Sequence, residues 1–309
     1  MPTAITFAAT LTRPDGTTQP LTATTQLLDP APRVALGHWR NQPAESGAAW
    51  RTRMDAAEAQ FGPFAGHWRD YLGVGSSGQL SAAHRQALAD GKRLFINWKP
   101  WSTNWAQVAS GARDPVIIPA AQSWAAPAGP AGDRWVCFGH EPENDGGAPA
   151  DFIAMFRRTA TLFRQYAPAV KIAWVCMGFD VPTSARYWPG AAYVDLLCHD
   201  PYITKGVAAA EMANRIIDRT GDLRQALPDA AGLPVVVAEW GPDLGGDLST
   251  ERGTDQHRAD AINGVRARLA DIAAAGVVEL CYFDARTDYL TAAGPDAAAY
   301  SALKAATER

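Results

Sequence analysis

The sequence predicts an α/β fold: a (β/α)8 TIM barrel with a short N-terminal β-ribbon extension. Three observations support this prediction. From residue 33 onward, eight short apolar runs alternate with amphipathic helical segments, which is the pattern of parallel βαβ units. Polar and aromatic residues follow the carboxyl ends of these runs, where barrels of this class carry their active sites. The length of 309 residues suits one such barrel with a small addition.

The first thirty residues differ in composition from the rest. Two threonine-rich segments, 4–12 and 21–28, have roughly alternating apolar and polar residues and flank Pro14-Asp-Gly16, a turn sequence. We therefore expect two units, an N-terminal β-ribbon or extension in residues 1–30 and a (β/α)8 catalytic barrel in residues 31–309.

The barrel elements are predicted from apolar periodicity. The expected strands are Arg33–His38, Phe64–Arg69, Arg93–Trp98, Trp135–Gly139, Lys171–Met177, Val194–His199, Pro234–Glu239 and Val277–Phe283. The expected helices are Ala48–Phe61, Ser81–Asp90, Val116–Trp124, Ala150–Tyr166, Ala208–Leu227, Asp255–Ala275 and Asp296–Thr307.

Composition excludes several functional classes. A net charge of −4 with scattered arginines argues against a nucleic-acid or anionic-membrane partner. No stretch has the length and apolarity of a membrane span, and the N-terminus lacks the pattern of a signal peptide. The four cysteines each fall in a predicted strand without a Cys-x-x-Cys pair, which indicates buried thiols and no metal site. We expect a monomer.

Two glutamates are the most informative residues. Glu141 follows the apolar run Trp135–Phe138, and Glu239 ends the run Leu233–Ala238, so both are expected at the rim of a core. Cleavage of a glycosidic bond requires two such carboxyl groups, one to protonate the departing oxygen and one to attack the sugar carbon. On the fourth and seventh strands of one barrel, they would face each other across its mouth. The sequence therefore predicts a glycosidase without a cofactor.

Further candidate residues lie at the same predicted rim. Tyr202 and His199 end the strand next to that of Glu239, so either is expected to donate a hydrogen bond to it. Indole faces stack on sugar rings, and several of the eleven tryptophans stand beside strand ends. The predicted substrate-binding residues are His140, Tyr202, His199, Asp200, Trp240, Trp98, His38 and Trp39.

Two alternatives remain open at this point. The first is a metal-dependent hydrolase, whose ligands would be His38, His140, His199 and Asp200. Barrel hydrolases of that kind commonly carry a His-x-His pair at the end of the first strand, where this chain has Gly37-His-Trp39. The second alternative is a catalytically silent barrel that binds carbohydrate or a protein partner.

The chain resembles glycoside hydrolase family 26, a family of retaining enzymes in clan A, over roughly residues 33–290 and most specifically from residue 138 to residue 241. The matching motifs are His140-Glu141, Tyr187-Trp-Pro-Gly190, Tyr193-Val-Asp195, Asp200-Pro-Tyr202 and Glu239-Trp-Gly241, with looser matches at Trp98-Lys-Pro100 and Ala109–Asp114.

The resemblance implies a role for each matched residue. Glu141 would be the general acid/base and Glu239 the nucleophile, with His140 on the sugar in the cleavage subsite and Tyr202 orienting Glu239. The substrate would be a β-linked polysaccharide or oligosaccharide, with endo-β-1,4-mannanase activity foremost and β-xylanase or β-glucanase specificity as the alternative. The resemblance also implies an extracellular location.

The chain departs from the family pattern at two places. Cys137 stands where the family often has arginine, three residues before the histidine. The segment Pro142–Gly147 replaces the Met-Asn-Gly and tryptophan that tend to follow the acid/base in mannanases. Both departures lie next to the predicted point of cleavage, so they bear on substrate choice.

Overall fold

The computed structural model describes residues 3–12, 18–27, 33–42, 47–99, 101, 104–125, 134–203, 207–242, 254–285 and 290–308. The chain divides into two compact units, residues 1–33 and residues 34–309. In the first unit, β1 (Thr3–Thr12) and β2 (Thr18–Leu27) pair antiparallel, from Thr3 opposite Leu27 to Thr12 opposite Thr18. The predicted β-ribbon is therefore confirmed, whereas its expected turn, Pro14-Asp-Gly16, lies outside the described residues.

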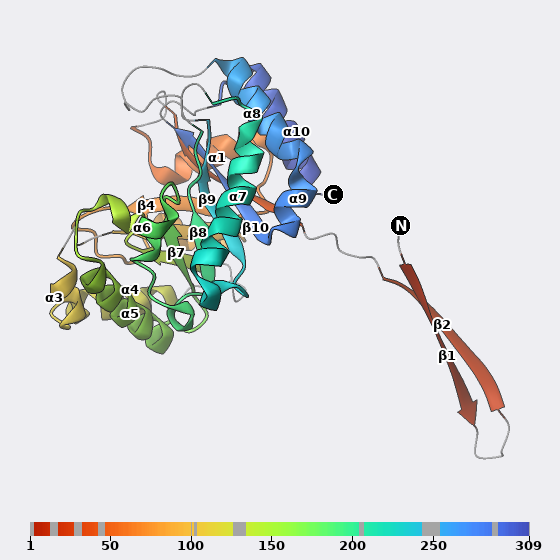
Figure 1. Cartoon of the computed structure of the whole chain (residues 1–309), viewed down its shortest axis with the longest axis horizontal. Helices are drawn as coiled ribbons and strands as arrows, with labels where there is room; N and C mark the ends of the chain where they lie inside the picture. The colour runs from red at the N-terminus through yellow and green to blue at the C-terminus, as the bar shows by residue number, and fades with distance from the viewer. Residues whose placement is uncertain are drawn as a thin grey trace. The chain divides into compact units, whose positions relative to one another are not determined.

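The second unit is a closed barrel of eight parallel strands, as predicted (Figure 1). The strands are β3 (Ala35–Asn41), β4 (Trp68–Leu72), β5 (Leu94–Trp98), β6 (Arg134–Phe138), β7 (Lys171–Cys176), β8 (Leu196–His199), β9 (Val235–Trp240) and β10 (Val277–Ala285). They are hydrogen-bonded in chain order, and β10 closes the barrel on β3. Each of the eight expected strands is present.

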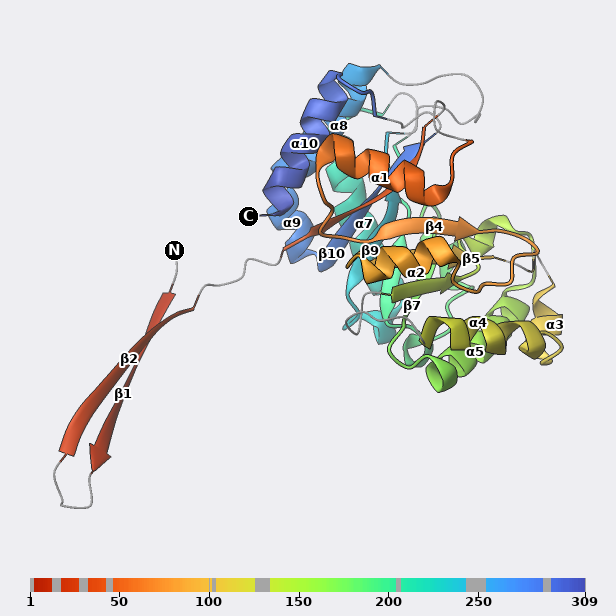
Figure 2. The same ribbon diagram turned by 180° about the vertical axis from the view of Figure 1, so that it is seen from behind.

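Helices surround the barrel, as Figures 1 and 2 show from opposite sides. They are α1 (Trp50–Phe61), α2 (Ala82–Ala89), α3 (Trp105–Ala109), α4 (Asp114–Ala125), α5 (Pro149–Tyr166), α6 (Val181–Ala185), α7 (Glu211–Ala226), α8 (Asp255–Ala267), α9 (Leu269–Ala274) and α10 (Pro295–Thr307). A 3-10 helix, η1 (Pro142–Asn144), follows β6. Among the described residues, no helix is both long and apolar enough to cross a membrane.

The structure differs from the predicted elements in three respects. The second barrel strand lies further along the chain than expected, at Trp68–Leu72. The helix expected at Asp255–Ala275 is two helices, because Arg268 leaves helical geometry (φ −111°, ψ 16°) between α8 and α9. The short helices α3 and α6 were not expected, since five-residue helices carry too little periodicity to be recognised.

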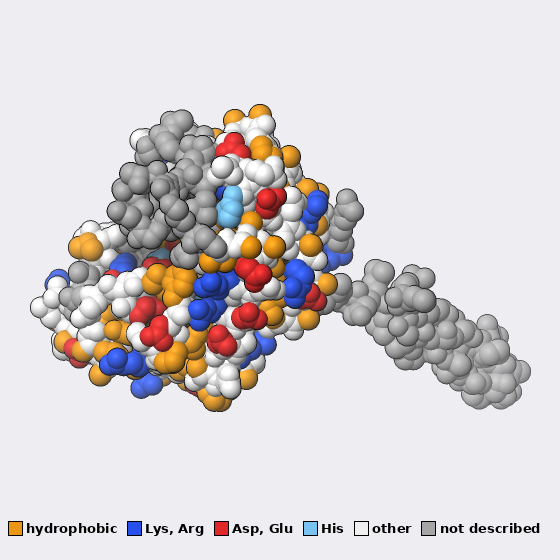
Figure 3. Space-filling model, turned by 45° about the horizontal axis from the view of Figure 1, so that its top comes forward, with side chains coloured by type: hydrophobic (Ala, Val, Ile, Leu, Met, Phe, Trp, Pro, Cys, Tyr) orange, Lys and Arg blue, Asp and Glu red, His pale blue; other side chains and the backbone are white. Residues whose placement is uncertain are grey.

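Side chains on the strands alternate between two apolar layers. The inner layer fills the barrel with residues such as Phe95, Trp135 and Val236. The outer layer, between strands and helices, is larger and includes Trp68, Trp98 and Trp174. On the face shown in Figure 3, acidic and basic side chains are interspersed over the described surface.

A buried ion pair between His67 and Glu279 lies inside the barrel, where the His67 ring stacks on Trp135. His67 donates its backbone N–H to Glu279 Oε1 at 2.7 Å, and its ring Nδ1 lies 2.8 Å from Glu279 Oε2. Burial alone would raise the pKa of Glu279, but His67 outweighs burial and holds that pKa below its ordinary value. The carboxylate is therefore the form that the folded barrel favours.

Glu279→Ala should lower the free energy of unfolding by about 2–5 kcal/mol at pH 7, since it leaves His67 buried without its partner. Because the pKa of Glu279 is lowered by folding, its contribution is present above the unfolded value near 4.5 and is lost as the pH falls through the folded value. Urea unfolding at several pH values measures both effects. The exposed Asp222→Ala is the control, and equal losses in the two variants would contradict the role of Glu279.

Candidate active site

The carboxyl ends of β6 and β9 hold the two glutamates singled out by the sequence. These strands are the fourth and seventh of the barrel, as predicted. On β9, Val236 and Ala238 belong to the inner layer, whereas Val237 and Trp240 belong to the outer one. The pairing with β10 shifts by one residue between Val237 and Trp240, and this bulge lets Glu239 follow Ala238 toward the barrel axis.

Glu239 is 6% exposed and is held at both carboxyl oxygens. The hydroxyl of Tyr71 donates to Oε1 at 2.5 Å, and that of Tyr202 donates to Oε2 at 2.8 Å. His140 Nε2 lies 3.3 Å from Oε1. Burial and the nearby Glu239 charge outweigh the Arg69 charge and raise the pKa of Tyr71 well above its usual value, so Tyr71 keeps the proton that it donates.

Arg69 lies inside the barrel beneath Glu239. Its guanidinium donates to the Ala238 carbonyl, lies 4.3 Å from the centre of the Phe95 ring, and places Nη2 3.9 Å from Glu239 Oε1. Arg69 and Tyr71 are alternate residues of β4, so both point inward from one strand. One strand thus supplies Glu239 with a hydrogen-bond donor and a fixed positive charge.

Glu141 occupies a strained position directly after β6. Its backbone is left-handed (φ 50°, ψ 59°), and it is the one non-glycine residue with positive φ among those described. Its N–H donates to the Val175 carbonyl at 3.1 Å, and Asn144 Nδ2 donates to its Oε2 at 3.3 Å. Strain of this kind costs on the order of 1–3 kcal/mol and is concentrated at functional sites.

The surroundings of Glu141 favour its protonated form. Burial raises its pKa to about 7, and the nearby carboxylates Asp200, Glu239 and Glu143 add to the effect against the opposing charge of His140. A carboxyl group with this pKa can hold a proton near neutral pH and release it during a reaction.

His140 and Asp200 connect the two glutamates. His140 Nε2 lies 2.6 Å from Asp200 Oδ2 and also faces Glu239. Asp200 follows β8, is fully buried, and has its pKa raised by burial and by the Glu239 charge. Around this group, Trp39 packs edge-on against Tyr71 at 4.6 Å, and Phe283 packs against Trp39 and Tyr202.

The structure brings together six of the ten predicted site residues: Glu141, Glu239, His140, Asp200, Tyr202 and Trp39. The other four lie in the outer layer. His38 contacts Tyr300 and Asp284, His199 contacts Thr220 of α7, Trp240 packs on Tyr282, and Trp98 lies under Gly78 and against Trp101. Burial lowers the pKa of His199 to about 3, so that ring is neutral.

The positions of the histidines argue against the predicted alternative of a catalytic metal held by His38, His140, His199 and Asp200. His38 and His199 face the helices, whereas His140 and Asp200 face the barrel axis, so the four residues do not form one set of ligands. Tyr71 and Asn144 were not predicted at the site, and Arg69 was expected at the end of its strand but not among the catalytic or substrate-binding residues. Side chains alternate between the two faces of a strand, so a predicted strand that continued from Arg69 to Leu72 would have placed Tyr71 on the same face as Arg69.

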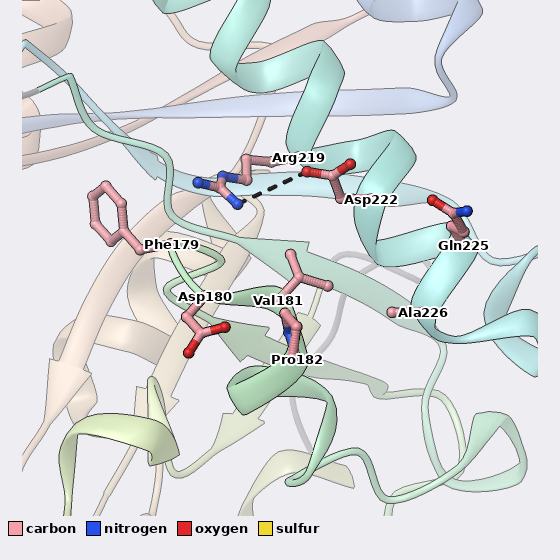
Figure 4. A pocket seen from close by; sticks show the side chains of 8 residues that line it. All are labelled: Phe179, Asp180, Val181, Pro182, Arg219, Asp222, Gln225 and Ala226. Atoms are coloured by element: carbon pink, nitrogen blue, oxygen red, sulfur yellow. Dashed lines mark ion pairs between the residues drawn. The ribbon is translucent and has the colours of Figure 1, made fainter.

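A separate groove lies between α6 and α7 (Figure 4). It has a volume of about 410 Å³, and Arg219 and Asp222 of α7 form an ion pair at 3.8 Å along its edge. Its lining residues are Phe179, Asp180, Val181, Pro182, Arg219, Asp222, Gln225 and Ala226. None of them belongs to the group around the two glutamates.

No protein-family model matches the sequence, and no curated protein matches it either. Solved structures do match. An endo-β-1,4-mannanase double mutant from Cellulomonas fimi aligns over 90% of this chain and 71% of its own, with 16% identity and a TM-score of 0.62. A GH26 β-mannanase from Bacteroides ovatus aligns over 88% of both chains, with 15% identity and a TM-score of 0.58.

A broad-specificity GH5-4 endoglucanase from an uncultured bacterium matches similarly. It aligns over 91% of this chain and 96% of its own, with 10% identity and a TM-score of 0.60. At identities this low, the likeness shows that this chain shares the barrel fold of these proteins.

Proposed function

We propose that this protein is a retaining glycoside hydrolase that cleaves β-linked polysaccharide with Glu239 as nucleophile and Glu141 as general acid/base. The observation that carries the proposal is the contrast between the two carboxyl groups. Glu141 has its pKa raised to about 7, whereas both oxygens of Glu239 accept hydrogen bonds from tyrosines. The shared fold with mannanases and an endoglucanase supports the same reaction class.

The reaction proceeds in two displacements. In the first, a Glu239 oxygen bonds to the anomeric carbon while the bond from that carbon to the departing sugar breaks, and Glu141 gives its proton to the departing oxygen. In the second, Glu141 takes a proton from water, the water oxygen bonds to the anomeric carbon, and the ester to Glu239 breaks. Tyr71 and Tyr202 hold the Glu239 oxygens in place for both steps.

We propose a β-1,4-mannan as the leading substrate, as the resemblance to family 26 implies. Cys137 and the Pro142–Gly147 segment differ from the mannanase pattern, so xylans and mixed-linkage glucans are the alternatives on the same machinery. An extracellular location fits a polysaccharide substrate. A silent carbohydrate-binding barrel is the second candidate, and it predicts sugar binding without hydrolysis.

The test is incubation of the protein with soluble β-mannans, xylans and mixed-linkage glucans, with products followed by chromatography and by proton NMR. We expect reducing ends from one of these glycans and the β-anomer as the first product, because two inversions restore the original configuration. Sugar binding without new reducing ends would favour the silent barrel, and an α-anomer formed first would contradict the retaining mechanism.

The pH dependence follows from the state of Glu141. Since the acid must carry its proton in the first step, kcat/KM should fall as the pH rises above about 7, where the raised pKa lies. Initial rates from pH 4 to pH 9 on a soluble glycan measure this decline in kcat/KM. Glu141→Ala, assayed on the same glycan at a higher enzyme concentration, should lose this decline, and an unchanged decline in the variant would assign it to another group.

A further inference from the structure

Three side chains of the site converge as a set of metal ligands. A ring nitrogen of His140 and carboxyl oxygens of Glu141 and Asp200 all lie within 4.8 Å of one another. Two of these residues follow β6 and the third follows β8, so the strand ends of the barrel hold them together. Zinc is bound by such nitrogen and oxygen donors at about 2.0–2.2 Å, with a fourth position for water.

We propose that this cluster binds a divalent transition-metal ion, represented by Zn²⁺, and that the bound ion inhibits the enzyme. The inhibition rests on the proposed function, whereas the binding does not. An ion held by Glu141 occupies the oxygen that would protonate the departing sugar, and it fixes His140 away from substrate. The ion is therefore a competitor of the substrate and takes no part in the reaction.

A second observation points to a ligand at this place. Asp200 is fully buried, and although its carboxyl group receives a backbone hydrogen bond from Glu239 and contacts His140 through Oδ2, its Oδ1 has no further partner in the described part of the chain. Leaving a buried carboxyl oxygen without a partner is costly, and a cation would offset that cost. The His140 side chain is 14% exposed, so an ion can reach the cluster from solvent.

The donor types favour zinc over calcium or magnesium. An imidazole nitrogen suits Zn²⁺, whereas Ca²⁺ and Mg²⁺ prefer oxygen donors throughout. The 2.6 Å contact between His140 Nε2 and Asp200 Oδ2 has to open slightly to admit an ion.

The chain offers few competing imidazoles or thiols. All four thiols are buried. Four other histidines, His38, His67, His84 and His199, are buried and contact Tyr300, Glu279, Asp70 and Thr220. His257 on α8 is only half-buried and is the sixth histidine. It provides a matched control, because it is a half-buried imidazole outside the cluster.

The experiment is calorimetric titration of the full chain with ZnCl₂ after treatment with EDTA. We expect saturable binding that weakens at least tenfold in His140→Ala and in the near-isosteric Glu141→Gln, and that stays unchanged in His257→Ala. Circular dichroism of each variant checks that it is folded. The same titration with CaCl₂ should show at least tenfold weaker binding. No binding, binding unchanged in both cluster variants, or binding lost in His257→Ala would overturn the site.

The inhibition is tested separately on the glycan that the enzyme cleaves. Zn²⁺ should raise KM without changing kcat, and EDTA should restore the original KM. Loss of activity with EDTA would overturn the inhibitory role, as would binding that leaves KM unchanged. Because calorimetry needs no substrate, a chain that binds Zn²⁺ at this cluster but cleaves no glycan refutes the proposed function and leaves the site standing.

Discussion

Replacing Glu239 with alanine should reduce glycan hydrolysis by about 10⁴-fold or more, because the variant has no group to form the covalent intermediate. Tyr71 and Tyr202 then face an empty space instead of a carboxylate. The loss should appear in kcat for activated and natural substrates alike, since attack on the anomeric carbon is required by both. Initial rates on the best glycan and on a dinitrophenyl glycoside measure it.

Rescue by azide distinguishes the loss of a nucleophile from other causes of inactivity. A small anion can enter the space left in Glu239→Ala and attack the anomeric carbon once, so it should restore turnover of the dinitrophenyl glycoside and yield the α-glycosyl azide. Glu239→Gln is the matched variant without that space, and azide should not rescue it. Wild-type rates in Glu239→Ala would remove Glu239 from the mechanism.

Glu141→Ala should give a different kinetic pattern, which separates its role from that of Glu239. Natural glycans need a proton on the departing oxygen, so their hydrolysis should fall by about 10²–10⁴-fold. A dinitrophenyl leaving group needs no proton, so formation of the intermediate should proceed and its breakdown should limit the rate. The result is a burst of dinitrophenol and a low KM.

The control for Glu141 is a second carboxylate of the same loop. Glu143 accepts hydrogen bonds from the Met177 N–H and the Ser184 hydroxyl, both at 2.7 Å, so it fastens the loop to the segment after β7. Glu143→Gln keeps the shape of this contact and should lower the rate less than tenfold. Azide should accelerate Glu141→Ala and yield the β-glycosyl azide. Equal losses in the two variants would contradict an acid/base role for Glu141.

The fold was predictable because its strands are nearly continuous apolar runs, which a barrel buries on both sides. The order of elements and the positions of Glu141 and Glu239 at strand ends follow from that pattern. The direction of each side chain was harder to predict, because it depends on where a strand begins and whether it bulges. His199 and Asp200 are neighbours in sequence, yet one faces α7 and the other faces the barrel axis.

Two local features explain most of the differences at the site. The strand expected to end at Arg69 continues to Leu72, and that extension brings Tyr71 onto Glu239. On β9, the bulge turns Glu239 inward and leaves Trp240 in the outer layer, where the sequence pattern had suggested a contact with sugar. Neither a strand boundary nor a bulge leaves a clear mark in a single sequence.

The proposed mechanism requires that Glu239 becomes covalently bonded to the sugar. In dinitrophenyl 2-deoxy-2-fluoro-β-glycosides, the fluorine slows both displacements, whereas the good leaving group keeps the first one fast enough to occur. The covalent intermediate should therefore accumulate. Intact-protein mass spectrometry should show one added fluoroglycosyl group, and peptide mapping should locate it on Glu239. A label on any other residue would contradict the account, as would an unlabelled enzyme that continues to turn over its glycan.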